Sequence, residues 1–157
     1  MTMRGRFINP TGYRLVKLPS EDDTALYEFT LELKYPLHFA CDDGRFFQPD
    51  KHEITDMGSI PPFVQAFLPK DRCLLTWIIH DSGYAKGGLY VAYREKQYTF
   101  LPMRRHELDN FMLAGMEAEG LDQTRRQLAY RMVRWFGWIA WYQRRHKAAQ
   151  GATHAKI

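Results

Sequence analysis

The 157-residue chain carries a formal net charge of +4, and 45% of its residues are hydrophobic. This length suits one domain with its own core, and the apolar content excludes an intrinsically disordered chain. No run of about 18 uncharged apolar residues is present, so we expect no transmembrane segment, and the first residues lack a signal-peptide apolar region. Cys41 and Cys73 form no C-x-x-C motif and are expected to be reduced thiols.

The first third of the chain predicts short β-strands. Apolar and polar residues alternate there, with β-branched and aromatic side chains, and Asp42-Asp43-Gly44 predicts a turn. The expected strands cover residues 4–8, 13–18, 26–35, 45–48 and 52–55. We expect them to form a small N-terminal antiparallel β-sheet.

From Ser59 onward the pattern predicts helices. Ser59 and Asp122 are suitable N-cap residues, and Pro69 and Pro102 precede two further helix starts. The expected helices cover residues 59–68, 71–83, 103–120 and 122–147, and residues 89–100 predict a β-hairpin or a long loop. The fold class is therefore α+β, with three to four packed helices after the sheet. We expect a single domain over residues 1–150 and a flexible tail over residues 151–157.

The dipeptide His80-Asp81 lies within the expected helix 71–83. At 100° per residue, apolar side chains cover nearly every side of this helix, which is typical of a buried helix. A buried carboxylate must be paired, protonated or bound to a metal. Three interpretations stay open here: a structural polar pair, a metal site, or general acid–base catalysis by His80.

Candidate partners for this pair lie elsewhere in the chain. Asp56 and Ser59 sit where strand gives way to helix, a junction that suits a catalytic side chain or an ordinary helix cap. Asp109 borders the inner face of helix 103–120, and it would either face His80 or form a surface pair with Arg105. The predicted catalytic residues are His80, Asp81, Asp56 and Ser59. The predicted ligands of a zinc or manganese ion are His80, Asp81 and Asp109.

The last helix carries two different faces. An i, i+4, i+7 stripe is assigned to the core: Leu128, Met132, Trp135, Ile139 and Tyr142. A second face interleaves aromatic and basic residues, and its predicted partner-binding members are Arg131, Arg134, Trp138, Trp141 and Arg145. From Gln123 to Ile157 there are eight Lys or Arg and no Asp or Glu. A protein partner is favoured for this face over nucleic acid or a membrane surface, and the alternative is that its tryptophans cover the strands.

The order of four motifs resembles a phage and prophage family called domain of unknown function thirteen-fifty-three. The motifs are Thr55-Asp56-x-x-Ser59-Ile60-Pro61, His80-Asp81-x-x-Tyr84, Arg105-x-Glu107-x-Asp109 and Arg134-x-Phe136-Gly137. The chain departs from the family pattern at Met57-Gly58, Arg104 and Leu108, and residues 85–102 look longer than is usual there. The resemblance implies a phage origin, and hence a location in the host cytoplasm or the virion. It also links Asp56, Ser59, His80, Asp81, Tyr84 and Asp109 as one signature.

Two functions follow as hypotheses. The first is a phage-encoded, metal-dependent hydrolase with His80, Asp81 and Asp109 as ligands or acid–base groups. The second is a virion or tail-assembly protein in which these residues form only a structural network. In that case the aromatic and basic helix would bind the partner.

Overall fold

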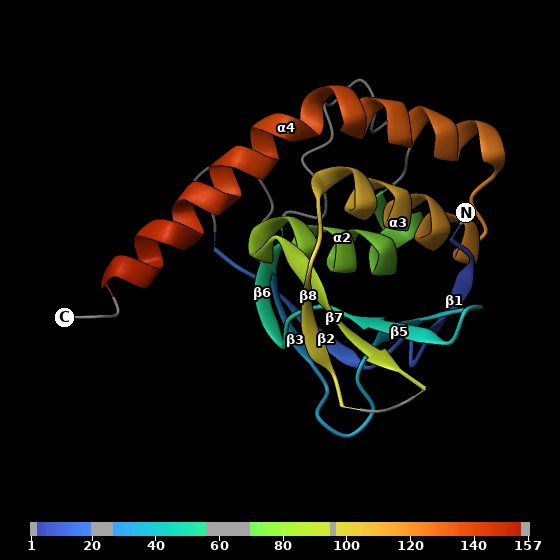
Figure 1. The fold of residues 1–157 in the computed structure, drawn as a ribbon, viewed down its shortest axis with the longest axis horizontal. Coiled ribbons are helices and arrows are strands. Elements are labelled where there is room, and N and C mark those ends of the chain that lie inside the picture. Colours follow the sequence, from blue (N-terminus) through green and yellow to red (C-terminus); the bar gives the residue numbers. More distant parts are fainter. Residues whose placement is uncertain (1–2, 20–26, 56–69, 95–96, 155–157) are drawn as a thin grey trace.

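Two antiparallel sheets lie on one side of three helices (Figure 1). The computed structural model describes residues 3–19, 27–55, 70–94 and 97–154, with only the backbone described for residues 70–71 and 143–154. The five-stranded sheet has the order β1 (Gly5–Ile8), β4 (His38–Cys41), β5 (Arg45–Gln48), β7 (Gly88–Tyr93) and β8 (Thr99–Pro102). The three-stranded sheet has the order β2 (Tyr13–Lys17), β3 (Tyr27–Leu31) and β6 (His52–Thr55). A short 3-10 turn (Lys70–Cys73) leads into α2 (Leu74–Lys86), followed by α3 (Arg105–Ala118) and α4 (Gln123–His154).

The predicted α+β class is confirmed, but the arrangement of strands differs in two respects. The strands form two sheets rather than one. Strand β4 was not predicted because its sequence, His38-Phe39-Ala40-Cys41, has three apolar residues in a row and no alternation of apolar and polar residues. Residues 88–102 form a β-hairpin, which extends the larger sheet at its edge. The predicted helix over residues 59–68 lies outside the described residues.

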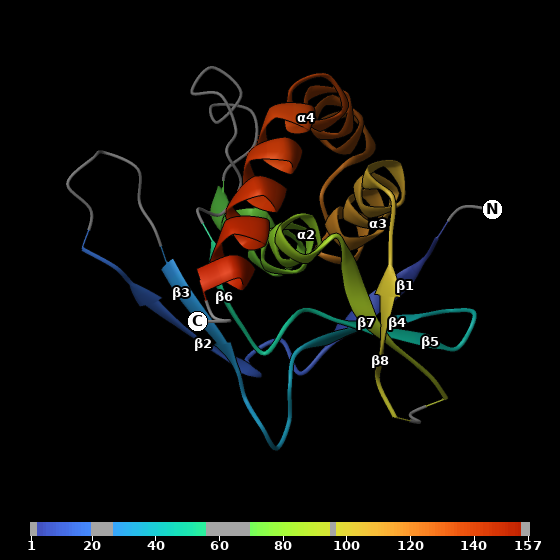
Figure 2. The same ribbon diagram turned by 60° about the vertical axis from the view of Figure 1, so that its left-hand side comes forward.

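Helix α2 is the central element of the fold. It lies between the sheets and the other two helices, and it contacts β6, β7, α3 and α4 (Figures 1 and 2). Every residue from Thr76 to Tyr84 is buried, which confirms the prediction of a helix enclosed on all sides. Phe111 of α3 joins the helices to the larger sheet through edge-to-face contacts with Phe39 and Phe47, at 5.0 and 5.3 Å between ring centres.

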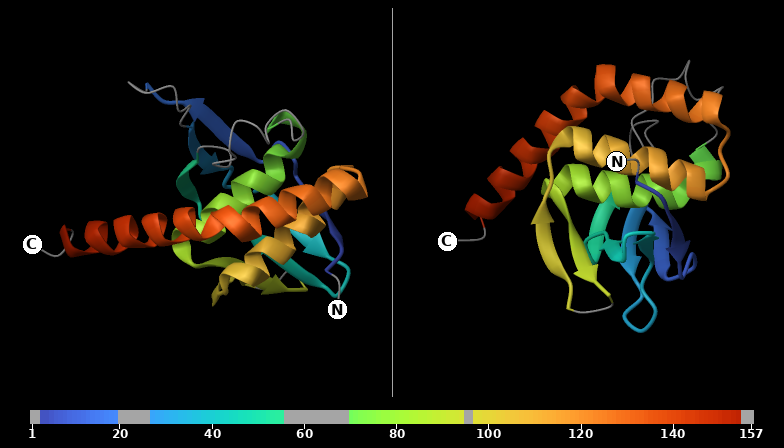
Figure 3. Two further views of the ribbon diagram at one scale, coloured as in Figure 1. Left: turned by 90° about the horizontal axis from the view of Figure 1, so that it is seen from above. Right: turned by 45° about the vertical axis from the view of Figure 1, so that its right-hand side comes forward.

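Helix α4 lies across α2 and α3, and its C-terminal half extends beyond them (Figure 3). Asp122 caps the helix, since its Oδ1 accepts a hydrogen bond of 3.0 Å from the Arg125 amide. The helix ends at His154 rather than near Lys147. The prediction that its Leu128 stripe forms core is wrong for Leu128, Trp135, Ile139 and Tyr142, which are exposed, whereas Met132 packs partly on the core. The inner face of α4 instead carries Ala129, Val133 and Trp141. The prediction of a flexible tail over residues 151–157 stays a prediction.

The N-terminus of α2 is held by a carboxylate from another helix. Cys73 makes no side-chain cap, and the Glu119 carboxylate accepts hydrogen bonds from the amides of Leu75 and Thr76 at 3.1 and 2.9 Å. It also accepts one of 2.5 Å from the Thr76 hydroxyl. A negative charge at this position satisfies amides that have no partner within the helix and interacts favourably with the helix dipole. Glu119 therefore fixes the end of α3 to the start of α2.

Replacing Glu119 by alanine is expected to lower the free energy of unfolding by about 2 kcal/mol, because the buried amides of α2 lose a charged acceptor. Glu117→Ala is the matched control, since Glu117 lies on the same helix and forms a half-exposed ion pair with Arg126. That control should cost less than about 1 kcal/mol. Urea unfolding followed by circular dichroism measures both, and equal losses would contradict the capping role.

Candidate functional site

Five polar side chains from three elements meet around α2. Thr55 is the last residue of β6, His80, Asp81 and Tyr84 lie on α2, and Asp109 lies on α3. All five are buried. A sixth residue, Arg134 of α4, reaches this cluster from the partly exposed side and forms an ion pair with Asp109. The structure thus brings together three of the predicted site residues: His80, Asp81 and Asp109.

Asp109 is the most buried charged group of the cluster, with none of its surface exposed. Its Oδ1 accepts hydrogen bonds from the Tyr84 hydroxyl and from His80 Nε2, the latter at 3.4 Å, and its Oδ2 accepts one of 2.8 Å from Arg134 Nη1. Burial alone would raise the pKa of Asp109, but these donors hold the pKa below its usual range. Asp109 is therefore an ionised carboxylate with both oxygens engaged.

His80 lies between two carboxylates that contact its two ring nitrogens differently. Its Nε2 points at Asp109 in a 3.4 Å contact, while its buried Nδ1 lies 3.9 Å from Asp81 Oδ1 and forms no hydrogen bond within the described part of the chain. Burial would lower the pKa of His80, but the neighbouring carboxylates Asp109 and Asp81 outweigh it and raise the pKa above its ordinary value. The imidazole therefore has one nitrogen oriented by a hydrogen bond and one nitrogen beside a carboxylate, a position that suits an acid, a base or a ligand.

Asp81 connects the cluster to the smaller sheet. Its Oδ2 accepts a 2.5 Å hydrogen bond from the hydroxyl of Thr55. Thr55 is followed in sequence by Asp56, so the segment that carries Asp56 and Ser59 begins at this edge of the cluster. Asp56 and Ser59 themselves lie outside the described residues, and their catalytic roles stay predictions.

Most residues of the cluster lie within the match to a known protein family. A sequence profile described as Protein of unknown function (DUF1353) matches residues 31–133, well over half of the chain. The chain belongs to this family. No curated protein and no solved structure matches it. The family match includes Thr55, His80, Asp81, Tyr84 and Asp109, and it ends one residue before Arg134.

The sequence of this DUF1353 protein did not predict the contacts that two members of the cluster, Arg134 and Tyr84, make. Arg134, rather than Arg105, is the ion-pair partner of Asp109, and Arg105 instead donates two hydrogen bonds of 3.3 Å to the Arg134 carbonyl. The surface pair between Arg105 and Asp109 was therefore a wrong alternative. Tyr84 also packs against Trp141 of α4, with 5.2 Å between ring centres.

In the sequence, the motif Arg134-x-Phe136-Gly137 was the feature that could have indicated this contact between α2 and α4. A Cβ atom at Gly137 would lie only 3.0 Å from the Tyr84 hydroxyl oxygen, so the absence of a side chain lets Tyr84 approach α4. Arg134 and Trp141 consequently lie on the inner side of α4, and their predicted position on an outer face is wrong. Arg131 and Trp138 do lie on the exposed side.

Two further observations concern metal ions and membranes. Among the described residues, no group of three or more His, Cys, Asp or Glu is arranged to hold a metal ion. No helix in the described ranges is both long and apolar enough to cross a membrane.

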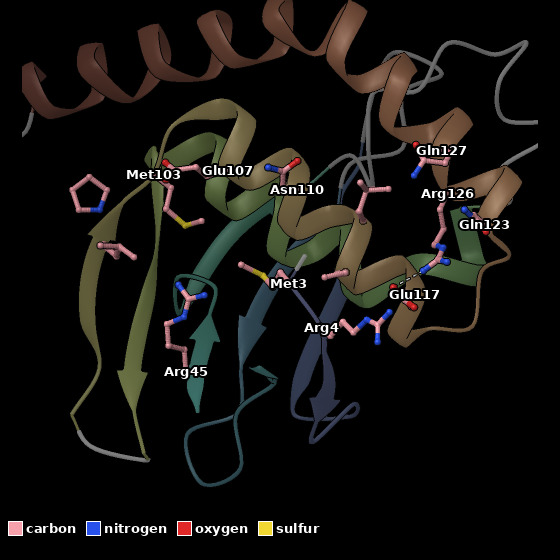
Figure 4. A pocket seen from close by; sticks show the side chains of 14 residues that line it. Met3, Arg4, Arg45, Met103, Glu107, Asn110, Glu117, Gln123, Arg126 and Gln127 are labelled. Atoms are coloured by element: carbon pink, nitrogen blue, oxygen red, sulfur yellow. Dashed lines mark ion pairs between the residues drawn. The ribbon is translucent and has the colours of Figure 1, made fainter. Parts of the chain in front are cut away.

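A groove of about 810 Å³ lies along α3 (Figure 4), and Asp109 is not among its lining residues. Glu107, Asn110 and Glu117 of α3 line it, together with Arg4 and Arg126. Arg126 is engaged there by Glu117 in an ion pair of 2.6 Å. The groove contains none of the predicted site residues, so we place the candidate site at His80.

Replacing Asp109 by asparagine is expected to lower the free energy of unfolding by about 3–5 kcal/mol, because an amide cannot accept from three donors and leaves Arg134 without a counter-charge. Asp43→Asn is the control, since Asp43 forms an exposed ion pair of 2.6 Å with Arg45. That change should cost about 1 kcal/mol at most. Chemical denaturation at neutral pH checks both variants, and a near-neutral Asp109→Asn would refute the role of Asp109 as the centre of the cluster.

The raised pKa of His80 makes stability depend on pH in a defined direction. The charged imidazole favours the folded state, so its contribution is complete below the unfolded pKa of about 6.5 and is lost as the pH rises through the folded value. The difference in unfolding free energy between the wild type and His80→Gln should therefore shrink from pH 5.5 to pH 9. His106→Gln, an exposed histidine on α3, should keep the wild-type pH profile. A difference that grows with pH would show that His80 is buried as the neutral form.

Proposed function

We propose that this protein is a phage-encoded, metal-dependent hydrolase whose reacting groups gather at His80 Nδ1 and Asp81. The observation that supports it is the asymmetry of His80, whose Nε2 points at Asp109 while its buried Nδ1 lies beside Asp81 and forms no hydrogen bond with any residue that the structure describes. Buried polar atoms in folded proteins are almost always satisfied, so an unsatisfied imidazole nitrogen beside a carboxylate indicates a binding or catalytic position.

The distance between His80 Nδ1 and Asp81 Oδ1 suits a shared divalent ion. Zinc binds histidine nitrogen and carboxylate oxygen at about 2.0–2.2 Å, so two ligand atoms 3.9 Å apart can contact one ion at an open angle. Zinc and manganese are the ions we propose. Any further protein ligand would come from outside the described residues, where Asp56 is the candidate from the sequence.

Asp109 has a different role in this proposal from the one expected from the sequence. Both of its oxygens already accept hydrogen bonds, so it is poorly placed to bind a metal directly. Histidines that bind metals usually donate their other ring N–H to a carboxylate, which fixes the ring and strengthens the ligand. Asp109 would therefore orient His80, and Tyr84 and Arg134 would keep Asp109 ionised.

The chemistry proposed for this site is hydrolysis. A bound divalent ion lowers the pKa of a coordinated water molecule towards neutrality. The chain supplies the remaining functions: Asp81 is positioned by the Thr55 hydroxyl, and His80 is oriented by Asp109. Asp56 and Ser59 are proposed to contact the substrate, because their segment follows Thr55 directly.

One observation favours the second candidate function, a virion or tail-assembly protein. Trp135, Trp138 and Tyr142 of α4 are more than half exposed, which is unusual for three large aromatic residues on one helix. In this alternative the His80 cluster is a structural network, and the exposed side of α4 binds a protein partner through Arg131 and Trp138.

The decisive measurement is the metal content and activity of the purified protein after loading with zinc or manganese. We expect stoichiometric metal in the wild type, loss of metal in His80→Ala, and hydrolysis of at least one substrate in a panel of chromogenic esters, phosphodiesters and amides. His80→Ala should reduce that rate by about 100-fold or more. Asp109→Asn should weaken metal binding by about 10- to 100-fold.

His106→Ala is the matched control, because it removes an exposed imidazole from α3 and should change neither metal content nor rate. Circular dichroism establishes that each variant is folded. A wild type without metal or hydrolysis, combined with His80→Ala that only lowers stability, would refute the hydrolase and leave the assembly function.

A further inference from the structure

The outer face of α4 is apolar and exposed to solvent. Leu128, Met132, Trp135, Ile139 and Tyr142 follow one another at alternating spacings of four and three residues. We call these five residues the outer stripe. Trp135 is 67% exposed, Tyr142 61% and Ile139 43%, whereas the opposite face of α4 packs on the core. Met132 packs partly on the core, and the other four residues of the outer stripe have no matching surface within the described part of the chain.

The size of this surface indicates an interface. Phe136 and Trp138 flank the outer stripe and are 45% and 52% exposed. Since a large aromatic side chain contributes about 150–250 Å², the exposed area of the outer stripe and its two flanking residues is roughly 600 Å² or more. That is at the upper limit of the apolar patches seen on monomers, about 300–600 Å². It approaches the ~800 Å² that each partner contributes to a stable protein interface.

The spacing of the outer stripe favours another helix as its partner. Apolar residues repeating every 3.5 residues on average form the seam along which two α-helices pack. The N-terminal half of α4 lies on α2 and α3, and its C-terminal half extends beyond them (Figures 1 and 3). Leu128, Trp135, Ile139 and Tyr142 of the outer stripe are exposed. A helix approaching from outside can lie along it without displacing any other element that the structure describes.

The charges near the outer stripe favour a protein surface over an anionic one. Arg125 is paired with Asp122, Arg126 with Glu117 and Arg134 with Asp109. Among the side chains described on α4, this leaves Arg131 as the arginine outside an ion pair. Membrane surfaces and nucleic acids are bound mainly through unpaired basic residues, so the described side chains suit an apolar partner better.

We propose that α4 pairs with α4 of a second copy of this chain, through the outer stripe, to form a two-fold symmetric dimer. A two-fold interface requires a self-complementary surface, and a symmetric apolar stripe centred on Trp135 meets this requirement. Trp135 lies seven residues from both Leu128 and Tyr142, so it packs at the centre of the interface against its own counterpart. The proposal stands apart from the hydrolase, because the outer stripe faces away from His80.

Light scattering coupled to gel filtration, and sedimentation equilibrium over a concentration series, test the dimer. The wild type is expected to be a dimer, and Trp135→Glu and Tyr142→Glu are expected to raise the dissociation constant by about 30-fold or more, as for interface hot spots. Leu33→Glu is the matched control, because Leu33 is 90% exposed and lies away from α4, and it should remain dimeric. Trp135 and Tyr142 make no contribution to the buried core, so these variants should stay folded by circular dichroism.

A cysteine at the centre of the outer stripe locates the interface directly. Cys41 and Cys73 are buried, so a Trp135→Cys variant offers one new exposed thiol on a background of protected ones. Mild oxidation should link Trp135→Cys into a covalent dimer and leave Leu33→Cys monomeric. A monomeric wild type at 100 μM would overturn the proposal, and so would a dimer that Trp135→Glu leaves intact. A monomer that binds phosphatidylglycerol vesicles would overturn it in favour of a membrane surface.

Discussion

The ionised carboxylate of Asp109 constrains how the three helices pack. A charge with no exposed surface is tolerated only when donors from its surroundings satisfy both oxygens, and here the donors come from other elements: His80 and Tyr84 from α2, and Arg134 from α4. Asp109 therefore fixes the positions of α2 and α4 relative to α3. The contact of Gly137 with the Tyr84 hydroxyl follows from the same constraint, because Tyr84 reaches Asp109 only where α4 approaches closely.

The sequence predicted the inner part of this cluster and missed its outer part. Apolar residues on every side of α2 required His80 and Asp81 to be buried. Asp109 borders the inner stripe of α3, which made a position facing His80 one of two alternatives. Both arguments use local helical periodicity, which a single sequence contains. The pairing of Asp109 with Arg134 joins residues 25 positions apart on different helices, and no periodicity rule specifies such a contact. The i, i+4 rule instead favoured Arg105, which is the nearest basic residue in sequence but not in space.

The prediction for α4 also failed because local periodicity does not specify which surface an apolar stripe contacts. Periodicity correctly separated its apolar stripe from its mixed aromatic and basic face, but it assigned the stripe to the domain core. A stripe at 3.5-residue spacing is equally suited to burial inside one chain and burial between two chains. The structure distinguishes them, because small residues such as Ala129 and Gly137 let the opposite face of α4 approach α2 and α3. Trp141 still packs on the inner side, whereas Trp135, Ile139 and Tyr142 are left exposed on the outside.

The two faces of α4 serve different purposes on neighbouring residues. Arg134 holds Asp109 from the inner side of the helix, and Trp135, the next residue, is the centre of the outer stripe. Asp109 in turn orients His80, whose buried Nδ1 lies beside Asp81 and forms no hydrogen bond with the described part of the chain. The inner face of α4 therefore completes the polar cluster, and the outer face is left for the proposed interface.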